Sequence, residues 1–243
     1  STLDIDFRIR NWNSEKLLGW GLSGTGGWPN GYDTYTLVGK PLPANDPVAA
    51  SDNDNAHKFY IPERTSEITI DGYLADDEWK NAERVSLKYE HVGWLMGQEG
   101  YTDIGDSYVL MQWDAEYLYL GFNIEDKTAA PLEKPTDSGD KVELCLFPSN
   151  AEGADTFARF TMAQCTDGSE HVFESNNILG ADYNVGAKKA TTNYGSEYVT
   201  EVAIPWTAFD AAKNALIEKG FECTYTPTVG TSFFLGIIVD DWN

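Results

Sequence analysis

Apolar, aromatic and β-branched residues gather in three short runs, at residues 108–113, 117–124 and 142–147. Segments rich in Asp, Gly and Pro separate these runs, and runs of about four to eight such residues between turn-forming residues are typical of β-strands. The short break at 113–116, which reads Trp-Asp-Ala-Glu, suits a hairpin. Because the runs are apolar on both faces, we expect central strands of a sandwich, with acidic loops at its rim.

Further short runs on both sides predict more strands. They lie at residues 4–13, 32–38, 68–70, 85–89, 156–164, 170–175, 198–204 and 233–239. Residues 75–82 read as a short helical turn, and a short helix begins at Trp206, with a continuation through 211–219 left open. The Asn- and Gly-rich segment that reaches Thr191 reads as a loop. The predicted fold class is therefore all-β, an antiparallel β-sandwich with short helical turns.

The length of 243 residues fits one large all-β domain or a domain with an appendage. With 17 basic and 39 acidic residues the formal net charge is −22, whereas nucleic-acid binding needs a basic footprint. No apolar run approaches the roughly 20 residues of a membrane helix, so no membrane partner is expected. An acidic, lysine-poor surface fits a soluble secreted protein, a calcium binder or both.

The sequence offers no pattern for catalysis. No nucleophile elbow, phosphate loop, HExxH motif or Cys–His arrangement appears, and the many acidic residues do not by themselves define the two facing carboxylates of a glycosidase. Cys145, Cys165 and Cys223 lack metal-ligand spacing. Cys145 lies in an expected strand and reads as a small buried hydrophobe, while a Cys145–Cys165 bridge is left open. We therefore expect no enzyme activity.

Five sequence blocks follow one another along the chain: ITIDGYLADDEW (68–79), YVLMQWDAEYLYLGFNIEDK (108–127), SGDKVELCLFP (138–148), YVTEVAIPWTAF (198–209) and FFLGIIVDDWN (233–243). In this order they resemble the family 9 carbohydrate-binding modules, part of the wider DOMON-like group of β-sandwiches. The resemblance implies a non-catalytic module that attaches a secreted or surface protein to polysaccharide or oligosaccharide.

The closing segment of that family stands at the other end of this chain. In the family, the strand resembling LGIIVDDWN is followed by a Gly- and Trp-containing loop and a last strand, whereas here residues 17–42 resemble that segment. We interpret residues 1–43 as closing strands of a sandwich, either its own or that of a neighbouring copy. Residues 44–65 read as a linker and residues 66–243 as the sandwich. Trp12-Asn13 matches Trp242-Asn243, which suggests one period of a repeat array. A structural or assembly module of repeated copies is therefore the alternative function.

The resemblance also implies a sugar site. Two tryptophans clamp a terminal sugar in the family, and Trp28 lies where one is expected. Residues 136–138 replace the second, so Trp94 or Tyr101 in the loop 91–106 is a candidate platform, or else a loop anchor. Aromatic faces cover the C–H surface of a sugar ring.

Two charged residues complete the candidate site. Glu143 and Arg159 resemble the family's sugar-binding Glu and Arg, whose side chains hydrogen-bond the hydroxyls. Both lie in apolar strands, where a charge is costly unless it is paired. The alternative is that the two pair with each other across strands. Thr161 and Thr25 depart from the family's amide residues.

The family carries structural calcium, which needs several hard oxygen ligands from loops. The candidate ligands are Asp71, Asp76, Asp77, Glu78, Asp126 and Asp140. The first four cluster around a turn, where helix capping is the ordinary alternative. No organic cofactor is expected. The minor alternative is a haem-binding DOMON-like domain, whose conceivable ligands are Met96, Met111, Met162, His91 and His171.

Overall fold

The computed structural model describes residues 6–11, 16–20, 33–39, 58–87, 106–127, 129, 140–147, 158–162, 165, 186–223 and 227–241. The first sheet contains β1 (Asp6–Asn11), β2 (Lys16–Trp20), β3 (Asp33–Val38), β4 (Lys58–Pro62), β8 (Lys141–Phe147), β9 (Ala158–Thr161) and β12 (Ser232–Asp241). The second contains β5 (Glu83–Ser86), β6 (Tyr108–Trp113), β7 (Tyr117–Glu125), β10 (Lys188–Asn193) and β11 (Glu197–Pro205). The helices are α1 (Asp76–Trp79) and α2 (Trp206–Glu218).

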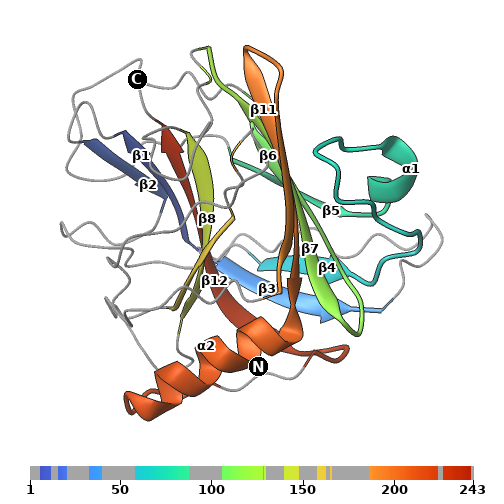
Figure 1. Cartoon of the computed structure of the whole chain (residues 1–243). Helices are drawn as coiled ribbons and strands as arrows, with labels where there is room; N and C mark the ends of the chain where they lie inside the picture. Colours follow the sequence, from blue (N-terminus) through green and yellow to red (C-terminus); the bar gives the residue numbers. More distant parts are fainter. Residues whose placement is uncertain are drawn as a thin grey trace.

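The strand β12 organises the first sheet. One of its edges pairs antiparallel with β8, which in turn pairs with β9. Its other edge pairs antiparallel with β3 at residues 232–235 and parallel with β1 at residues 236–241. β2 and β4 extend the sheet beyond β1 and β3. β12 is thus covered on both edges by strands from distant parts of the sequence (Figure 1).

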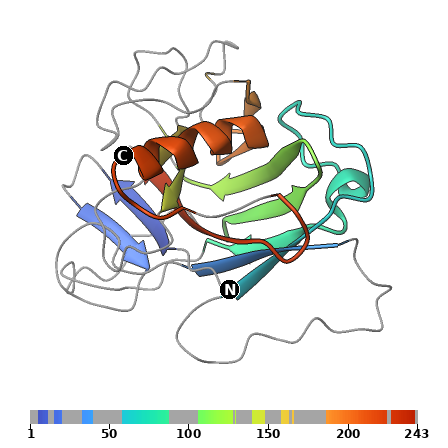
Figure 2. The same ribbon diagram turned by 90° about the horizontal axis from the view of Figure 1, so that it is seen from below.

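The second sheet is antiparallel throughout, in the order β10-β11-β7-β6-β5. Its central strands β6, β7 and β11 coincide with apolar runs from which the sequence predicts strands. The two sheets pack face to face, and α2 runs across one end of the sandwich (Figure 2). The predicted β-sandwich is therefore confirmed.

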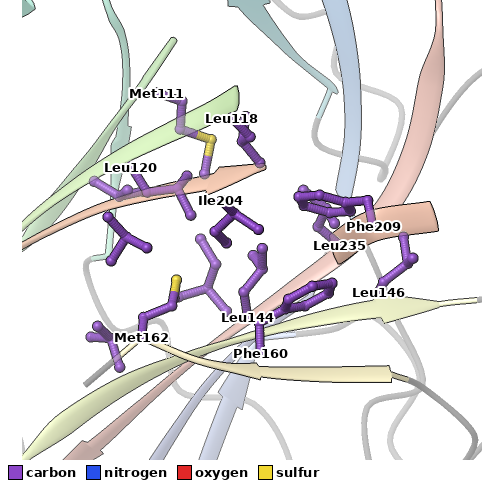
Figure 3. Packing of buried hydrophobic residues seen from close by; sticks show 14 of the residues in the cluster. Met111, Leu118, Leu120, Leu144, Leu146, Phe160, Met162, Ile204, Phe209 and Leu235 are labelled. Atoms are coloured by element: carbon purple, nitrogen blue, oxygen red, sulfur yellow. The ribbon is translucent and has the colours of Figure 1, made fainter. Parts of the chain in front are cut away.

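Alternating residues of both sheets fill the space between them. Phe160 of β9 packs on Phe209 of α2 with ring centroids 4.8 Å apart. Figure 3 shows this contact among side chains from both layers, all fully buried: Met111, Leu118, Leu120, Leu144, Leu146, Phe160, Met162, Ile204, Phe209 and Leu235. Fully burying one such side chain stabilises the fold by about 1.5–3 kcal/mol. Met111 and Met162 are thus core residues.

A smaller cluster covers the outer face of the second sheet. It consists of Ile68, Trp79, Tyr119 and Ala203. The segment 66–75 and α1 bring Ile68 and Trp79 onto the sheet. The sequence predicts a strand at 68–70, but the structure has none there, because these residues pack through side chains onto a sheet whose β7 already pairs with β6 and β11.

The N-terminal strands contribute to the common core. Leu37 of β3 and Ile61 of β4 are fully buried in the cluster between the sheets. Lys58–Pro62 falls within the segment interpreted as a linker, yet it forms β4 and pairs parallel with β3. In this structure β1 and β3 pair with β12 of the same chain. The interpretation of residues 1–43 as a displaced closing segment remains a prediction. The domain boundaries at residues 43 and 65 are predictions too.

One other local prediction differs from the structure. β10 lies in the segment that we interpret as a loop up to Thr191, and it pairs with β11 along Lys188–Asn193. Cys145 is buried, as expected, and none of the three cysteines forms a disulfide, so the Cys145–Cys165 bridge that the sequence left open is absent.

Candidate functional site

The strand β8, which lies between β12 and β9, places Glu143 in the interior of the first sheet. Val142 and Leu144, its neighbours, are fully buried in the core between the sheets. Because successive side chains of a strand point to opposite faces, Glu143 lies on the face turned away from that core. It is nevertheless only 1% exposed. A carboxylate held in this way is costly unless other polar groups compensate for lost water.

Arg159 lies on the neighbouring strand. In the register of β8 and β9, Glu143 stands opposite Thr161 and Cys145 opposite Arg159. The backbone positions of Glu143 and Arg159 are therefore diagonal neighbours, as both the sugar-site prediction and the alternative of a cross-strand pair require. Trp28, Trp94 and Tyr101, the predicted aromatic contacts, lie outside the described residues.

The acidic turn before α1 uses its carboxylates locally. Asp71 Oδ1 accepts a hydrogen bond from the backbone N–H of Tyr73 at 3.0 Å. Glu78 accepts one from the hydroxyl of Thr69 at 2.9 Å. Asp76 and Asp77 are exposed in the first turn of α1, where negative charge is favourable. The N-cap is Ala75, so no side chain caps this helix.

Asp126 and Asp140 lie deeper. Asp126 directly follows β7 and is 1% exposed, and Asp140 directly precedes β8 and is 2% exposed. The backbone N–H of Asp126 donates to the carbonyl oxygen of Ser196 at 3.0 Å, which ties the end of β7 to the hairpin between β10 and β11. Within the described part of the chain, no three His, Cys, Asp or Glu side chains lie close enough together to hold a metal ion. Calcium remains a prediction.

Glu201 is a buried carboxylate that the sequence analysis missed. It is fully buried in β11 and accepts hydrogen bonds from the backbone N–H groups of Asp71 and Gly72, at 2.9 and 2.8 Å. It also accepts one from Trp79 Nε1 at 3.0 Å. Burial raises the pKa of Glu201, and these hydrogen bonds partly offset that rise. The signal was present in the sequence, since Glu201 interrupts the apolar run 198–204 as Glu143 interrupts its own.

Asp114 fixes the hairpin between β6 and β7. Its carboxylate accepts hydrogen bonds from the backbone N–H groups of Glu116 and Tyr117 at 2.7 and 2.8 Å. It also accepts from the Tyr119 hydroxyl at 2.9 Å and from Arg64 Nε at 2.5 Å. Burial alone would raise the pKa of Asp114, but the hydrogen bonds, that of Arg64 foremost, lower it below its usual value. This arrangement stabilises the sandwich rather than forming a ligand site.

Three tryptophans are core residues. Trp79, Trp113 and Trp206 are 3%, 5% and 5% exposed. Trp206 Nε1 donates to the carbonyl oxygen of Asp114 at 2.7 Å, and Trp113 Nε1 donates to that of Val38 at 2.8 Å. Their polar atoms are therefore used within the fold.

The two packed sheets form a β-sandwich of the kind that the resemblance implies, and β8 carries the buried carboxylate of Glu143 on the outer face of the first sheet. The family model described as carbohydrate family 9 binding domain-like matches residues 70–231. The chain belongs to this family, and it is a carbohydrate-binding module. No described helix has the length and apolar character needed to cross a membrane.

Two similar proteins are much longer than this chain. Over 155 residues, 63% of this chain, it is 29% identical to endo-1,4-beta-xylanase A of Thermoanaerobacterium saccharolyticum and covers 12% of that protein. Over the same length it is 26% identical to exoglucanase XynX of Acetivibrio thermocellus and covers 13% of it. The chain thus spans a small fraction of the curated relatives it matches.

Solved structures of family 9 carbohydrate-binding modules from Caldicellulosiruptor kristjanssonii are also similar. One, in complex with cellotriose, matches at 12% identity and a TM-score of 0.39, covering 86% of this chain and 94% of that one. Another, in complex with glucose, matches at 13% identity and a TM-score of 0.38, covering 76% and 96%.

Proposed function

We propose that this module holds a secreted or cell-surface protein on a polysaccharide, and that it does so without catalysing a reaction. The observation that carries the proposal is the family match over residues 70–231, which includes β8 and its buried Glu143. Glu143 is a carboxylate on the outward face of a strand in the interior of the first sheet, a position from which its oxygens can serve a ligand site.

The proposed contacts divide into stacking and hydrogen bonding. Glu143 accepts hydrogen bonds from sugar hydroxyls, and Arg159 on the adjacent strand donates to them, since charge-assisted bonds are the strong ones. Trp28 stacks on the ring, with Trp94 or Tyr101 as a second platform. The register that sets Glu143 and Arg159 on neighbouring strands supports this division.

The ligand class follows from two considerations. The named relatives are a xylanase and an exoglucanase, and the similar structures hold cellotriose or glucose. We therefore propose β-1,4-linked glucan or xylan, or their oligosaccharides. The formal net charge of −22 favours an uncharged glycan, because an anionic polysaccharide would be repelled.

A structural calcium ion is part of the proposal. Asp126 and Asp140 are the favoured ligands because both are buried and flank the loop between β7 and β8. The carboxylates of Asp71 and Glu78 fit less well, since these residues are more exposed than Asp126 and Asp140. The ion would stiffen the rim and would not contact the sugar.

The test is a binding screen with Ca²⁺ present, using cellotriose, xylotriose, cellulose and xylan. We expect binding to at least one of them, with Glu143→Gln weakening it about tenfold or more. Glu116→Gln, at an exposed position of the β6–β7 hairpin, is the matched control and should bind normally. Failure of the unmodified chain to bind any of the four would refute the proposal, and unchanged binding by Trp28→Ala would remove Trp28 from the site.

Assembly of copies is the second candidate. The N-terminal strands β1 and β3 complete the edge of β12, and exchange of such strands between copies would preserve the same pairings. Light scattering coupled to size-exclusion chromatography distinguishes the two states. A mass above that of one chain supports exchange, and a single-chain mass at all concentrations contradicts it.

A further inference from the structure

We propose that Tyr73 and Tyr194 form a second carbohydrate-contact surface, separate from the site around Glu143. These tyrosines are 63% and 47% exposed, and they are the aromatic members of the exposed large hydrophobic residues in the described part of the chain. The inference rests on the proposed function, because it assumes that the module binds glycans.

The two tyrosines belong to turns that touch each other. The Tyr194 hydroxyl donates a hydrogen bond to the carbonyl oxygen of Gly72, next to Tyr73, at 3.3 Å. A Cβ atom placed on Gly72 would lie 2.4 Å from Thr192 Oγ1. The turn that carries Tyr73 is therefore pressed against the β10–β11 hairpin that carries Tyr194.

Both backbones are held in place before any ligand arrives. On one side, Glu201 accepts hydrogen bonds from Asp71 and Gly72, and Asp71 accepts one from Tyr73. On the other side, the backbone N–H of Tyr194 donates to the carbonyl oxygen of Glu197 at 2.8 Å. Exposed tyrosines on a fixed backbone provide contact area at a low cost in conformational entropy, which favours binding.

The chemistry around the two rings suits a neutral sugar. Each ring offers an aromatic face for the C–H surface of a pyranose, and the Tyr194 hydroxyl, whose proton goes to Gly72, can still accept a hydrogen bond. The exposed carboxylate of Asp71 is an additional acceptor for sugar hydroxyls. The strongly acidic chain disfavours an anionic ligand. An uncharged β-linked polysaccharide is therefore the favoured occupant.

This surface and Glu143 lie on opposite sides of the sandwich. The segment containing Tyr73 covers the outer face of the second sheet, where Trp79 packs, whereas Glu143 lies on the outer face of the first. The core separates them, so one short oligosaccharide cannot contact both. A polymer network offers several chains at once, and two weak contacts then act together.

The experiment compares polymer with oligomer binding. Its main variant is Tyr73→Ala/Tyr194→Ala, and its matched control is Val229→Ala/Ile217→Ala, which truncates apolar side chains that are 63% and 48% exposed. We expect the tyrosine variant to lose about threefold to tenfold in affinity for insoluble cellulose or xylan, the size of an aromatic contact. Cellotriose or xylotriose binding should stay unchanged, and the control should match the unmodified chain in every assay. Tyr73→Ala alone, which removes none of the hydrogen bonds above, repeats the test should the double variant unfold.

The outcomes are separable. If the unmodified chain binds polymer and the tyrosine variants bind equally well, the second surface is refuted while the proposed function stands. If the tyrosine variants lose trisaccharide binding to the same degree, the pair belongs to the main site and the inference is again wrong. If the unmodified chain binds no glycan tested, the proposed function and this inference fail together. Conversely, Glu143→Gln should weaken trisaccharide binding by about tenfold or more and retain part of its affinity for polymer.

Discussion

Glu201 accepts the indole N–H of Trp79 at 3.0 Å across a sequence separation of 122 residues. The same carboxylate receives the backbone N–H groups of the turn at 71–73. A single buried side chain of β11 therefore fixes both the turn and α1 on the outer face of the second sheet. This face carries Tyr73, so its rigidity bears on binding as well as on stability.

Removing the Glu201 carboxylate should destabilise the fold. In Glu201→Ala, the donors of Asp71, Gly72 and Trp79 lose their acceptor, and each buried unsatisfied group costs about 1–3 kcal/mol. Because the turn can relax towards water, we expect a total loss of about 2–4 kcal/mol in the free energy of unfolding. Urea unfolding measures it, with Glu116→Ala as the exposed control. A loss in the free energy of unfolding no larger than that of the control would show that the turn does not depend on Glu201.

Gly121 of β7 allows the close approach of the segment before α1. A Cβ atom there would lie 2.5 Å from Leu74 Cδ2 and 3.1 Å from Trp79 Cζ2. Gly121→Ala should therefore destabilise the protein by about 1–3 kcal/mol through overpacking. The matched control is Gly39→Ala, whose new Cβ would meet Val229 at an ordinary 3.9 Å. Equal melting temperatures for the two variants would contradict the prediction.

The sequence predicted the central strands because hydrophobicity and length agree there. The apolar runs at 117–124 and 198–204 became β7 and β11, which are buried on both faces. β10 was missed because Lys188–Asn193 is polar and pairs among the described strands only with β11, so burial leaves little trace in its sequence. β4 was missed because its apolar residues follow an Asn- and Asp-rich stretch that reads as a linker.

The candidate site was predictable to a similar degree. Glu143 stands out as a charge inside an apolar run, and the structure places it on the outer face of a central strand. Glu201 has the same signature but serves the turn at 71–73. A sequence does not distinguish these two roles, because the difference lies in which distant backbone groups reach the carboxylate.

Glu83 should make stability depend on pH. It stands opposite the fully buried Met111, and burial raises the pKa of its carboxyl to about 7. Between the unfolded value, about 4.3, and 7 the folded state binds more protons than the unfolded state, so stability is full below about pH 4.3 and falls as pH rises through 7.

Glu83→Gln removes this titration. Allowing for partial exposure, it should stabilise the protein by about 1–2 kcal/mol at pH 8 and change little at pH 4.5. Urea unfolding at the two pH values measures the difference, and Glu116→Gln controls for the loss of a charge. A Glu83→Gln variant with the same pH dependence as the unmodified chain would exclude this role.

Calcium removal should lower the melting temperature if Asp126 and Asp140 hold an ion. Their carboxylates are buried at the ends of β7 and β8, and an ion that binds only the folded state stabilises it in proportion to the logarithm of its concentration. At a hundredfold excess over the dissociation constant the gain is about 2.7 kcal/mol, which for a protein of this size corresponds to a shift of several degrees. Chelation with EDTA followed by Ca²⁺ addition should lower and then restore the melting temperature. Asp126→Asn/Asp140→Asn should abolish that response, whereas Asp76→Asn/Asp77→Asn should leave it intact. If EDTA does not change the melting temperature, the fold does not depend on calcium. The two buried carboxylates would then be structural residues that bind no ion.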